Sequence, residues 1–521
     1  MISRRQKLET IRRAAVPARM QPPSITTLPA PYGGLNARDS FEAMKPEDAI
    51  ELVNWFPGSG KVTVRGGSAE HASRTSETNP VETLATLRTA SGEFMLAASG
   101  TQVWNATSAG AQGSSIGTGL GNARWSTVVM NGVLGMVNGA TAPRTWDGTT
   151  FSTMTVSGSG LAVADLIGVN VFKSRSYFWK DSSQDFWYSA VNTLGGALTL
   201  FPLGDVGTFG GRLLRMITWT RDGGSGMDDL AVFVMSSGEV IVYAGSNPGS
   251  ADDWSLVGVF RIGEPLSARS MVKLGGDVVI CTTDGYALLS KVLPGATGAR
   301  GINVSDKIGP LARQRAAELR GVFGWEALHY PGGERLMVNY PAASGAEQHV
   351  ANIATGAWTV FRGMPARCWT IFGGRPYFGG AAGTVYEADT GSSDAGAKIT
   401  ATGRSAFSYL GTRQNKLVTM VRPLLESAAA VPARIALSTD FDPGLSREVS
   451  AIIGAQSASG TKWDTAKWDT FKWAASARTV QEWLAHEARG YAVSPRIQVE
   501  QSSAPISWSA TTLAHKPSGV I

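Results

Sequence analysis

Cysteine is almost absent from this chain, which has only 2 in 521 residues. Cys281 and Cys368 have no histidine beside them, and their spacing fits no zinc site. Cys281 lies in an apolar run and is expected to pack as a small buried hydrophobe. A disulfide between the two is the alternative, although the chain shows no other feature of a disulfide-stapled secreted scaffold.

Charged residues and long apolar runs are scarce as well. Only 17% of the residues are charged, whereas hydrophobic residues reach 43%, which is enough for solid cores. No apolar run approaches the ~18 residues that a transmembrane helix needs, so no membrane-spanning segment is expected. The N-terminus is charged without an apolar segment behind it, and we therefore expect no secretory signal.

The residue patterns of common catalytic sites are missing. The sequence has no HExxH and no GxSxG, so neither a zinc protease nor a hydrolase triad has an anchor. The histidines are scattered and are expected to be structural or solvated: His71, His329, His349, His486 and His515. No catalytic residue, cofactor or metal site is therefore predicted.

Neighbouring carboxylates are the one pattern that a glycosidase could use as acid and nucleophile. Asp228-Asp229 and Asp252-Asp253 both lie beside glycine, serine or proline, where aspartate usually accepts backbone N–H bonds in a turn. The stretch 145–151 comes close to an Asp-box turn but lacks a residue between Asp147 and Gly148. These carboxylates are therefore predicted to cap turns.

Glycine and tryptophan, by contrast, are abundant, with 62 and 16 copies. Many turns together with aromatic-rich apolar runs are typical of an all-β protein. Since 521 residues exceed one ordinary hydrophobic core, two or more domains are expected.

Short apolar runs alternate with glycine turns over much of the chain. Asn131-Gly132 and Asp284-Gly285 accept the positive φ of tight hairpin turns. Comparable turns recur every ~40–50 residues, the spacing of a four-stranded propeller blade, which predicts a β-propeller of about six or seven blades over residues 32–390. The predicted hairpins are 95–98 with 102–104, 127–130 with 133–137, 230–235 with 239–243, and 277–281 with 286–289.

Around Gly391 the composition changes to small polar residues, which indicates a linker. Alternating runs beyond it, such as 434–438 and 496–500, suit the strands of a β-sandwich. The predicted fold class is all-β: a β-propeller followed by a C-terminal β-sandwich over 391–521, with an extended basic N-terminal arm over 1–31.

Two local features belong to this prediction. Beyond the N-terminal 20 residues, helices are expected only at 311–320 and 478–489. Gly58–Lys61 resembles part of a phosphate loop, but the GxxxxGK[ST] spacing is absent, so we predict a hairpin turn that leads into the strand 62–65.

Positive charge is concentrated at the N-terminus. Residues 1–20 hold six basic residues against Glu9 alone, which leaves the rest of the chain at a net charge of +1. A short basic helix is expected there, and the prolines that follow predict an extended arm. A disordered tail, a transit peptide, and an arm that docks on a neighbouring subunit or on nucleic acid are the alternatives. The candidate interface residues of the arm are Arg4, Arg5, Arg12 and Arg13.

Lysine and tryptophan recur every five residues in the stretch 462–473. This spacing matches neither the period of a strand nor that of a helix. We expect the indoles to pack against the sandwich or a neighbouring subunit, and stacking on single-stranded nucleic acid is the alternative. The candidate interface residues are Trp463, Trp468 and Trp473.

Several phrases of the chain resemble one family. They are Gly33–Ser40, Asn138–Gly148, Arg221–Gly285 and Trp463–Trp468. Over roughly residues 30–515 the chain resembles the tail nozzle proteins of short-tailed bacteriophages, a group that includes packaged-DNA stabilisation proteins. The shared phrases are turns and strands, so no catalytic residue is carried over, and the basic arm lies outside the resemblance.

The resemblance implies a structural protein of the virion tail, assembled in the host cytoplasm, and not an enzyme. Such proteins form a ring, usually sixfold, that closes the DNA channel at the distal end of the tail and releases the genome at infection. The implied partners are further copies of the chain, a portal or adaptor ring, tail fibre or spike proteins, and double-stranded DNA in the lumen. A nearly neutral body would not retard the passing DNA.

Two other functions stay open at this point. A propeller that binds or hydrolyses host surface polysaccharide would depend on carboxylates such as Asp147 or Asp222. A free DNA-binding protein would depend on residues 1–20, and its DNA affinity would fall steeply with salt.

Overall fold

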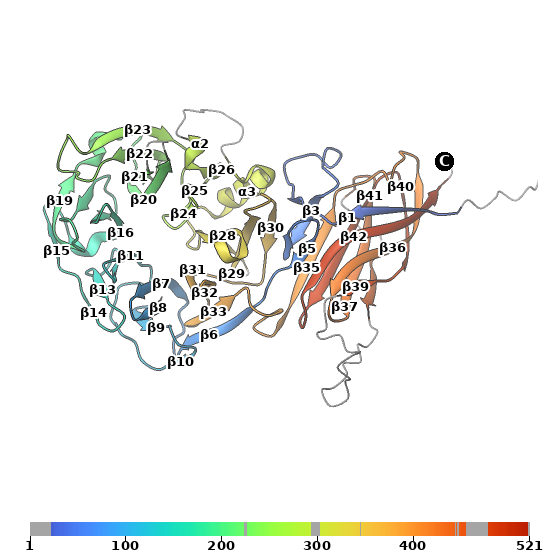
Figure 1. Ribbon diagram of the computed structural model, residues 1–521, viewed down its shortest axis with the longest axis horizontal. Coiled ribbons are helices and arrows are strands. Elements are labelled where there is room, and N and C mark those ends of the chain that lie inside the picture. The colour runs from blue at the N-terminus through green and yellow to red at the C-terminus, as the bar shows by residue number, and fades with distance from the viewer. Residues whose placement is uncertain are drawn as a thin grey trace, which may run out of the picture.

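The computed structural model describes residues 22–222, 227–292, 303–343, 345–442, 444, 447–454 and 478–518, without the side chains of residues 221, 222, 227 and 228. Strands dominate these residues, and the chain is all-β as predicted. Figure 1 shows two parts, a propeller-like ring of small sheets and a group of longer strands beside it. Among the described helices, none has the length and apolar character needed to cross a membrane.

Five separate sheets form most of the ring. The first contains β7 (Val81–Thr89), β8 (Gly92–Ser99) and β9 (Gln102–Asn105). The second contains β11 (Ser126–Met130), β12 (Val133–Val137), β13 (Arg144–Trp146) and β14 (Phe151–Thr153). The third contains β15 (Val156–Gly158), β16 (Leu166–Phe172), β17 (Arg175–Lys180), β18 (Phe186–Tyr188) and β19 (Gly196–Phe201). The fourth contains β20 (Leu213–Asp222), β21 (Met227–Met235), β22 (Glu239–Ala244) and β23 (Ser255–Arg261). The fifth contains β24 (Met271–Leu274), β25 (Asp277–Thr282) and β26 (Gly285–Leu288).

Two further antiparallel meanders complete the ring and belong to a 16-stranded sheet. One contains β27 (Glu326–Tyr330), β28 (Arg335–Ala342), β29 (Gly345–Asn352) and β30 (Trp358–Phe361). The other contains β31 (Cys368–Phe372), β32 (Arg375–Gly379) and β33 (Thr384–Ala388). Its next neighbour is β6 (Ser68–Arg74), which comes from the start of the chain, pairs antiparallel with β33 and takes the short β10 (Gly110–Gln112) on its other side. The ring is thus closed by strands from its two ends.

The hairpin predictions are confirmed. β8 pairs with β9, β11 with β12, β21 with β22 and β25 with β26, all antiparallel. Asn131 and Gly132 take φ values of 51° and 75° between β11 and β12. Positive φ at both central residues is typical of a tight two-residue hairpin turn. The turn at Gly58–Lys61 is confirmed as well, since Trp55–Pro57 pairs antiparallel with Val62–Val64.

The second part contains strands from both ends of the chain. From the N-terminal side come β1 (Ser24–Pro29), β2 (Gly34–Leu35), β3 (Asp48–Val53), β4 (Trp55–Pro57) and β5 (Val62–Val64). From the C-terminal side come β34 (Ser393–Asp394), β35 (Ala397–Ser405), β36 (Lys416–Ser427), β37 (Val431–Thr439), β38 (Val449–Ile453), β39 (Arg478–Gln481), β40 (Leu484–Gly490), β41 (Val493–Gln501) and β42 (Ile506–Pro517). One sheet has the order β39-β36-β42-β5-β4, and β35, β37, β38 and β41 belong to the 16-stranded sheet.

The few helices are short. They are α2 (Leu289–Val292), α3 (Gly309–Leu319) and the 3-10 turns η1 (Val163–Asp165), η2 (Leu203–Asp205), η3 (Asp306–Ile308) and η4 (Pro331–Gly333). The helix predicted at 311–320 is confirmed by α3. The helix predicted at 478–489 is wrong: β39 and β40 occupy this stretch, and along β40 every second residue is buried. That period of two belongs to a strand.

Part of the N-terminal arm is also regular. Residues 24–29 form β1, which pairs antiparallel with β42 from Ser24 opposite His515 to Pro29 opposite Ala510. The flanking prolines do not prevent this pairing, because proline is tolerated at the end of a strand on a sheet edge. The prediction of an arm without regular structure up to residue 31 is therefore corrected for these residues.

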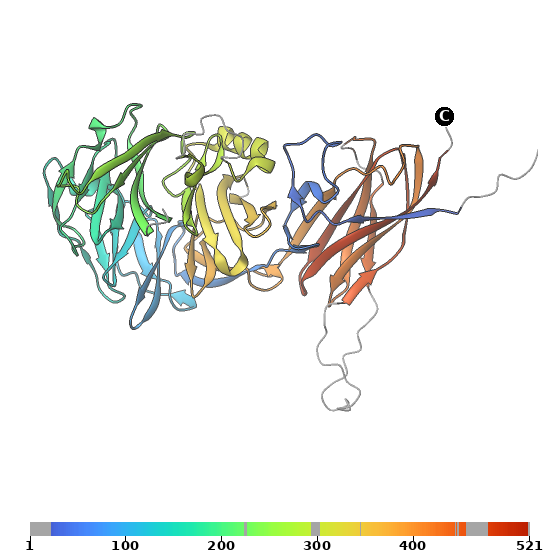
Figure 2. The ribbon, with the colours of Figure 1, turned by 45° about the horizontal axis from the view of Figure 1, so that its top comes forward.

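The pairing crosses the predicted domain limits at residues 31 and 390. β5 pairs with β42, β3 pairs with β35 and touches β30, and β6 neighbours both β33 and β34. Figure 2 shows the blue N-terminal segment passing from one part into the other. Whether the predicted boundaries separate units that fold independently stays a prediction. In the structure, the N-terminal segment pairs with strands of both parts.

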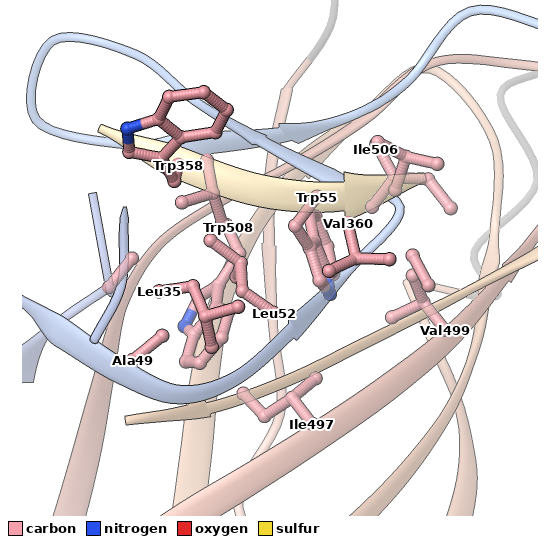
Figure 3. Close-up of a cluster of buried hydrophobic side chains, with 14 of the residues drawn as sticks. Leu35, Ala49, Leu52, Trp55, Trp358, Val360, Ile497, Val499, Ile506 and Trp508 are labelled. Carbon is pink, nitrogen blue, oxygen red and sulfur yellow. The ribbon is translucent and has the colours of Figure 1, made fainter. Parts of the chain in front are cut away.

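A buried cluster lies where the two parts meet (Figure 3). Trp55 of β4 and Trp508 of β42 are both fully buried, with ring centroids 5.9 Å apart. Trp358 of β30 and Val499 of β41 belong to the same cluster. Because side chains from the ring and from the second part share one core, apolar burial holds the two parts together.

Candidate functional site

The interface residues predicted from the sequence lie outside the described residues. These are Arg4, Arg5, Arg12, Arg13, Trp463, Trp468 and Trp473. The short basic helix expected within 1–20 lies outside them too. The structure therefore neither supports nor opposes these predictions, and the site has to be sought elsewhere.

The turn-cap prediction is wrong for Asp228 and Asp229, which lie within β21 and pair with β20; the Asp229 carboxylate accepts a hydrogen bond from the Thr220 hydroxyl at 2.7 Å. Two other carboxylates considered for glycosidase chemistry do cap turns. Asp147 accepts hydrogen bonds from the backbone N–H groups of Thr149 (2.8 Å) and Thr150 (2.7 Å). These bonds lower the pKa of Asp147 to about 2. Asp253 similarly accepts from the Ser246 hydroxyl at 2.7 Å, which lowers its pKa. Asp147 and Asp253 thus act as turn caps, and the sequence prediction is confirmed for these two residues.

The Gly33–Ser40 phrase forms a polar network under η3. Asn36 donates to Asp48 at 2.8 Å, and Lys307 donates to the other oxygen of the same carboxylate at 2.7 Å. Gly34 has a φ of 82°, and a Cβ atom there would lie 2.6 Å from the backbone nitrogen of Trp358. The phrase therefore has a structural role, since its glycine permits close contact with β30 and its asparagine orders the loop.

A buried ion pair lies at the junction of the ring and the second part, and its arginine reaches the ring through the Arg362 carbonyl after β30. The Arg65 guanidinium is 1% exposed and contacts both oxygens of Asp394, at 2.9 and 2.5 Å. It also donates to the Asn54 side chain at 3.0 Å and to the Arg362 carbonyl at 2.5 Å. Such a bidentate geometry fixes both direction and distance. Arg65 follows β5, and Asp394 is in β34, so this ion pair sets the junction.

A cavity, which we call the channel, lies at the centre of the ring. It has a volume of about 1240 Å³. The lining residues come from the strand at one end of each small sheet or meander: β7, β11, β16, β20, β24, β27 and β31. The centre of the ring is therefore a concave feature where polar groups from several sheets converge, and such features commonly hold ligands.

The channel wall carries an excess of positive charge. Six cations line it, Arg124, Arg212, Arg215, Lys273, Arg269 and Arg320, against three carboxylates, Asp181, Glu264 and Glu326. Arg212 pairs with Asp181 and Arg320 pairs with Glu264. Arg124 pairs with Glu82 behind the wall and lies over the Phe323 ring, 4.2 Å from its centroid. Arg124, Arg212 and Arg320, which lie just outside the strands, thus each form an ion pair with a carboxylate.

Arg269 holds the wall together. Its guanidinium donates to the Glu82 carbonyl at 2.6 Å, to the Thr83 hydroxyl at 2.7 Å and to the Trp125 carbonyl at 3.1 Å. The nearest Glu326 oxygen is 3.9 Å away. These bonds connect the segment before β24 with β7 and the start of β11, so Arg269 has a structural role in the ring.

Arg215 and Glu326 are two further charged residues of the channel wall. Arg215 donates to the Ala268 carbonyl at 2.6 Å, and burial lowers its pKa. Burial raises the pKa of Glu326 to about 7, while Arg269 and the backbone N–H of Trp369 oppose this shift. Desolvation disfavours the charged form of each group. The wall is consequently less negative near neutral pH than its composition indicates.

A second buried polar group lies between α3 and the meander of β28 and β29. The His349 ring is fully buried, and its Nδ1 lies 2.7 Å from the Tyr286 hydroxyl. Burial lowers the pKa of His349 to about 3. Among the described residues, no group of three or more histidine, cysteine or acidic side chains could hold a metal ion. Cys281 and Cys368 are both free and buried.

Sequence reasoning missed the channel residues. Arg215 follows Leu213-Leu214 and precedes Met216-Ile217, so a charge within an apolar strand was the available signal. Such a charge requires a partner or a water-filled space. The convergence of Arg215, Arg269 and Glu326 could not be found this way, because the three residues come from separate parts of the ring.

Three solved structures with a distant likeness to this chain are described here. No family model matches the chain, and no curated protein matches it. A computationally designed protein is 10% identical, with 61% of this chain and 99% of that chain covered and a TM-score of 0.36. A putative 6-phosphogluconolactonase from Bacteroides fragilis is 12% identical, with 58% and 88% covered and a TM-score of 0.35. The WD40 domain of SCAP from fission yeast is 8% identical, with 54% and 66% covered and a TM-score of 0.28. These likenesses carry no conclusion about what the chain binds or does.

Proposed function

We propose that this chain is a structural component of a short bacteriophage tail, where copies form a nozzle ring that closes the DNA channel and releases the genome at infection. The sequence resemblance over residues 30–515 supports this proposal. Its partners would be further copies of the chain, a portal or adaptor ring, tail fibre or spike proteins, and the passing double-stranded DNA.

The observation that carries the proposal is the shared construction of the two parts. The N-terminal segment pairs with strands of both, and the Arg65–Asp394 ion pair and the Trp55–Trp508 contact lie where they join. A ring subunit that resists pressure along the tail axis needs parts that do not hinge, and interlocked strands with a shared core meet this need. The Gly33–Ser40 phrase, on which the resemblance partly rests, lies at this junction.

The proposal includes a finer description of the fold. The five separate sheets, the β27–β30 meander and the β31–β33 meander with β6 would be the seven blades of a propeller. The longer strands of the second part would form a β-sandwich that contacts neighbouring subunits. An experimental structure of the assembled ring would test both points.

The assembly is tested on the purified full-length chain. Native mass spectrometry and negative-stain microscopy should show a closed ring with one defined number of copies, usually six in this family. Changing Trp463, Trp468 and Trp473 together to alanine should reduce ring formation while circular dichroism still reports folded protein. A chain that stays monomeric at tens of micromolar, about the range where a weak contact would still populate rings, would contradict the proposal.

The basic arm provides a second comparison. Changing Arg4, Arg5, Arg12 and Arg13 to glutamine removes most of the positive charge of residues 1–20. If the arm docks on an adaptor ring or on DNA, the nozzle ring should still form, but its salt-sensitive retention on that partner should fall. Loss of the nozzle ring itself would place the arm between copies of this chain instead.

A further inference from the structure

Arg215 is a half-buried cation that forms no ion pair with a carboxylate of the described residues. Its guanidinium makes one hydrogen bond to the wall, to the Ala268 carbonyl, and within the described residues no acidic oxygen lies within ion-pair distance of it. Glu326 and Arg269 are the charged groups that act on it electrostatically, and Arg269 is engaged by the wall. A guanidinium has five N–H donors, so most donors of Arg215 are left for the channel.

The surroundings of Arg215 offset its charge only in part, through Glu326. The paired arginines Arg124, Arg212 and Arg320 have their own carboxylates, whereas Lys273, farther along the same channel, makes no ion pair within the described residues. Burial lowers the pKa of Lys273, as it does for Arg215. Glu326 near Arg215 and Asp229 near Lys273 offset part of their charge, but neither cation forms an ion pair within the described residues. Two such cations on one wall make an anion in the cavity electrostatically favourable.

We propose that the central channel is a binding site for the oxyanion group of a small molecule, a carboxylate or a phosphate, with Arg215 as the residue that contacts it directly and Lys273 as the second cation. This site is independent of the proposed tail function, because it lies within one chain and needs no ring of copies. A guanidinium binds a planar or tetrahedral oxyanion through two parallel N–H bonds, which favours this class of ligand.

The size and lining of the cavity favour an organic anion over a bare ion. About 1240 Å³ exceeds the space of one oxyanion, and apolar side chains such as Val169, Met216 and Leu266 line it together with the cations. Ligand sites of this kind combine an apolar wall with a few placed polar groups. A sugar acid or a sugar phosphate of one ring would fit both features.

The test is isothermal titration calorimetry at low ionic strength on the full-length chain. The probes are galacturonate, inorganic phosphate and neutral galactose. We expect galacturonate to bind and galactose to bind at least about tenfold more weakly, because a charged hydrogen-bond partner is worth that much. Binding of phosphate at equal or higher affinity would identify a free oxyanion as the ligand, and tighter binding of galacturonate would identify an organic acid.

Variants locate the binding. Arg215→Gln should weaken galacturonate binding at least about tenfold, and Lys273→Gln should weaken it less. Arg88→Gln is the matched control, because Arg88 is 77% exposed, pairs only with Glu93 and does not line the channel. Arg215→Lys keeps the charge and replaces Arg215→Gln in the test if the glutamine variant does not fold. Its affinity for galacturonate should still fall, because lysine cannot form the bidentate contact of a guanidinium.

The outcomes that would overturn the proposal are equally definite. They are the absence of measurable binding of both anions to the unchanged chain, equal binding of galactose and galacturonate, and unchanged affinity in folded Arg215→Gln. Binding that weakens equally in Arg88→Gln would also overturn it, since this would show a non-specific charge effect.

Discussion

Among single residues, Arg65 and Asp394 have the clearest consequence for stability. Their ion pair is almost wholly buried, and Arg65 keeps four further contacts around it. Changing Asp394 to asparagine removes the charge and leaves a buried guanidinium uncompensated. We expect the free energy of unfolding to fall by about 3 kcal/mol, measured by denaturant titration.

Arg375→Gln is the control for that experiment. Arg375 pairs with Glu387 on the same ring, but its side chain is 58% exposed. Exposed ion pairs contribute less than ~1 kcal/mol because water and salt screen them. Equal losses of stability in the two variants would show that the Arg65–Asp394 ion pair has no special role.

His349 predicts a pH dependence of stability. The unfolded chain binds a proton on this histidine below pH 6.5, whereas burial holds its native pKa at about 3. The unfolded state therefore binds more protons between these values, and the free energy of unfolding falls as the pH drops. The loss from pH 7 to pH 5 should be on the order of 2 kcal/mol.

To assign this pH dependence to His349, the stability must also be measured in a variant that lacks its imidazole. His349→Gln should be less stable at pH 7, because the bond to Tyr286 changes, but its stability should fall less steeply between pH 7 and pH 5. Glu326 contributes with the opposite sign, since its pKa is raised from 4.5 to about 7 and the native state holds its proton longer. Both measurements are therefore best made in a Glu326→Gln background. Parallel pH curves would contradict the assignment to His349.

At the scale of elements, the hairpins could be predicted and the strand-rich C-terminus only in part. Asn131-Gly132 and the glycine turns define local pairs, and local pairs need no knowledge of the remaining fold. The stretch 478–489 looked helical because it holds alanine, glutamate and leucine. Its buried face repeats every second residue, with Leu484, His486 and Ala488 inward, and packing against β36 decides its conformation.

The channel and the junction were beyond prediction for a related reason. Arg65 and Asp394 are 329 residues apart in sequence. Trp55 and Trp508 are separated even further. Local patterns carry no information about such contacts, which depend on which strand lies beside which. Only the isolated charge of Arg215 within an apolar strand hinted at a site.

β1 is the element whose removal should be most informative. It covers β42 along six residues, and Leu28 packs into the shared core. Deleting residues 1–29 should lower the free energy of unfolding by ~3 kcal/mol or more, through lost strand hydrogen bonds and lost apolar burial. It should also promote aggregation, because the edge of β42 becomes free to pair.

Deleting residues 1–21 alone is the matched control for β1. This shorter deletion removes none of the described strand pairing. Thermal denaturation and light scattering should give values close to those of the full chain. If the shorter deletion destabilises the protein as much as the longer one, β1 is not the cause.

For the whole molecule, the shared strands predict cooperative unfolding. β3 and β6 pair with strands of both parts, and one buried cluster extends from Leu28 to Tyr286. Neither part can lose its structure without exposing the core of the other. Differential scanning calorimetry should show one transition, with equal calorimetric and van 't Hoff enthalpies. Two well-separated peaks would show that the parts fold independently.

The antiparallel pairing of β1 with β42 places residues 24 and 515 opposite each other, so the described chain starts and ends at neighbouring points of one sheet. A short glycine-serine bridge could join these points without crossing the protein. The chain could then be opened at an exposed turn of the ring, such as Asn131-Gly132. The resulting circular permutant would keep the same architecture.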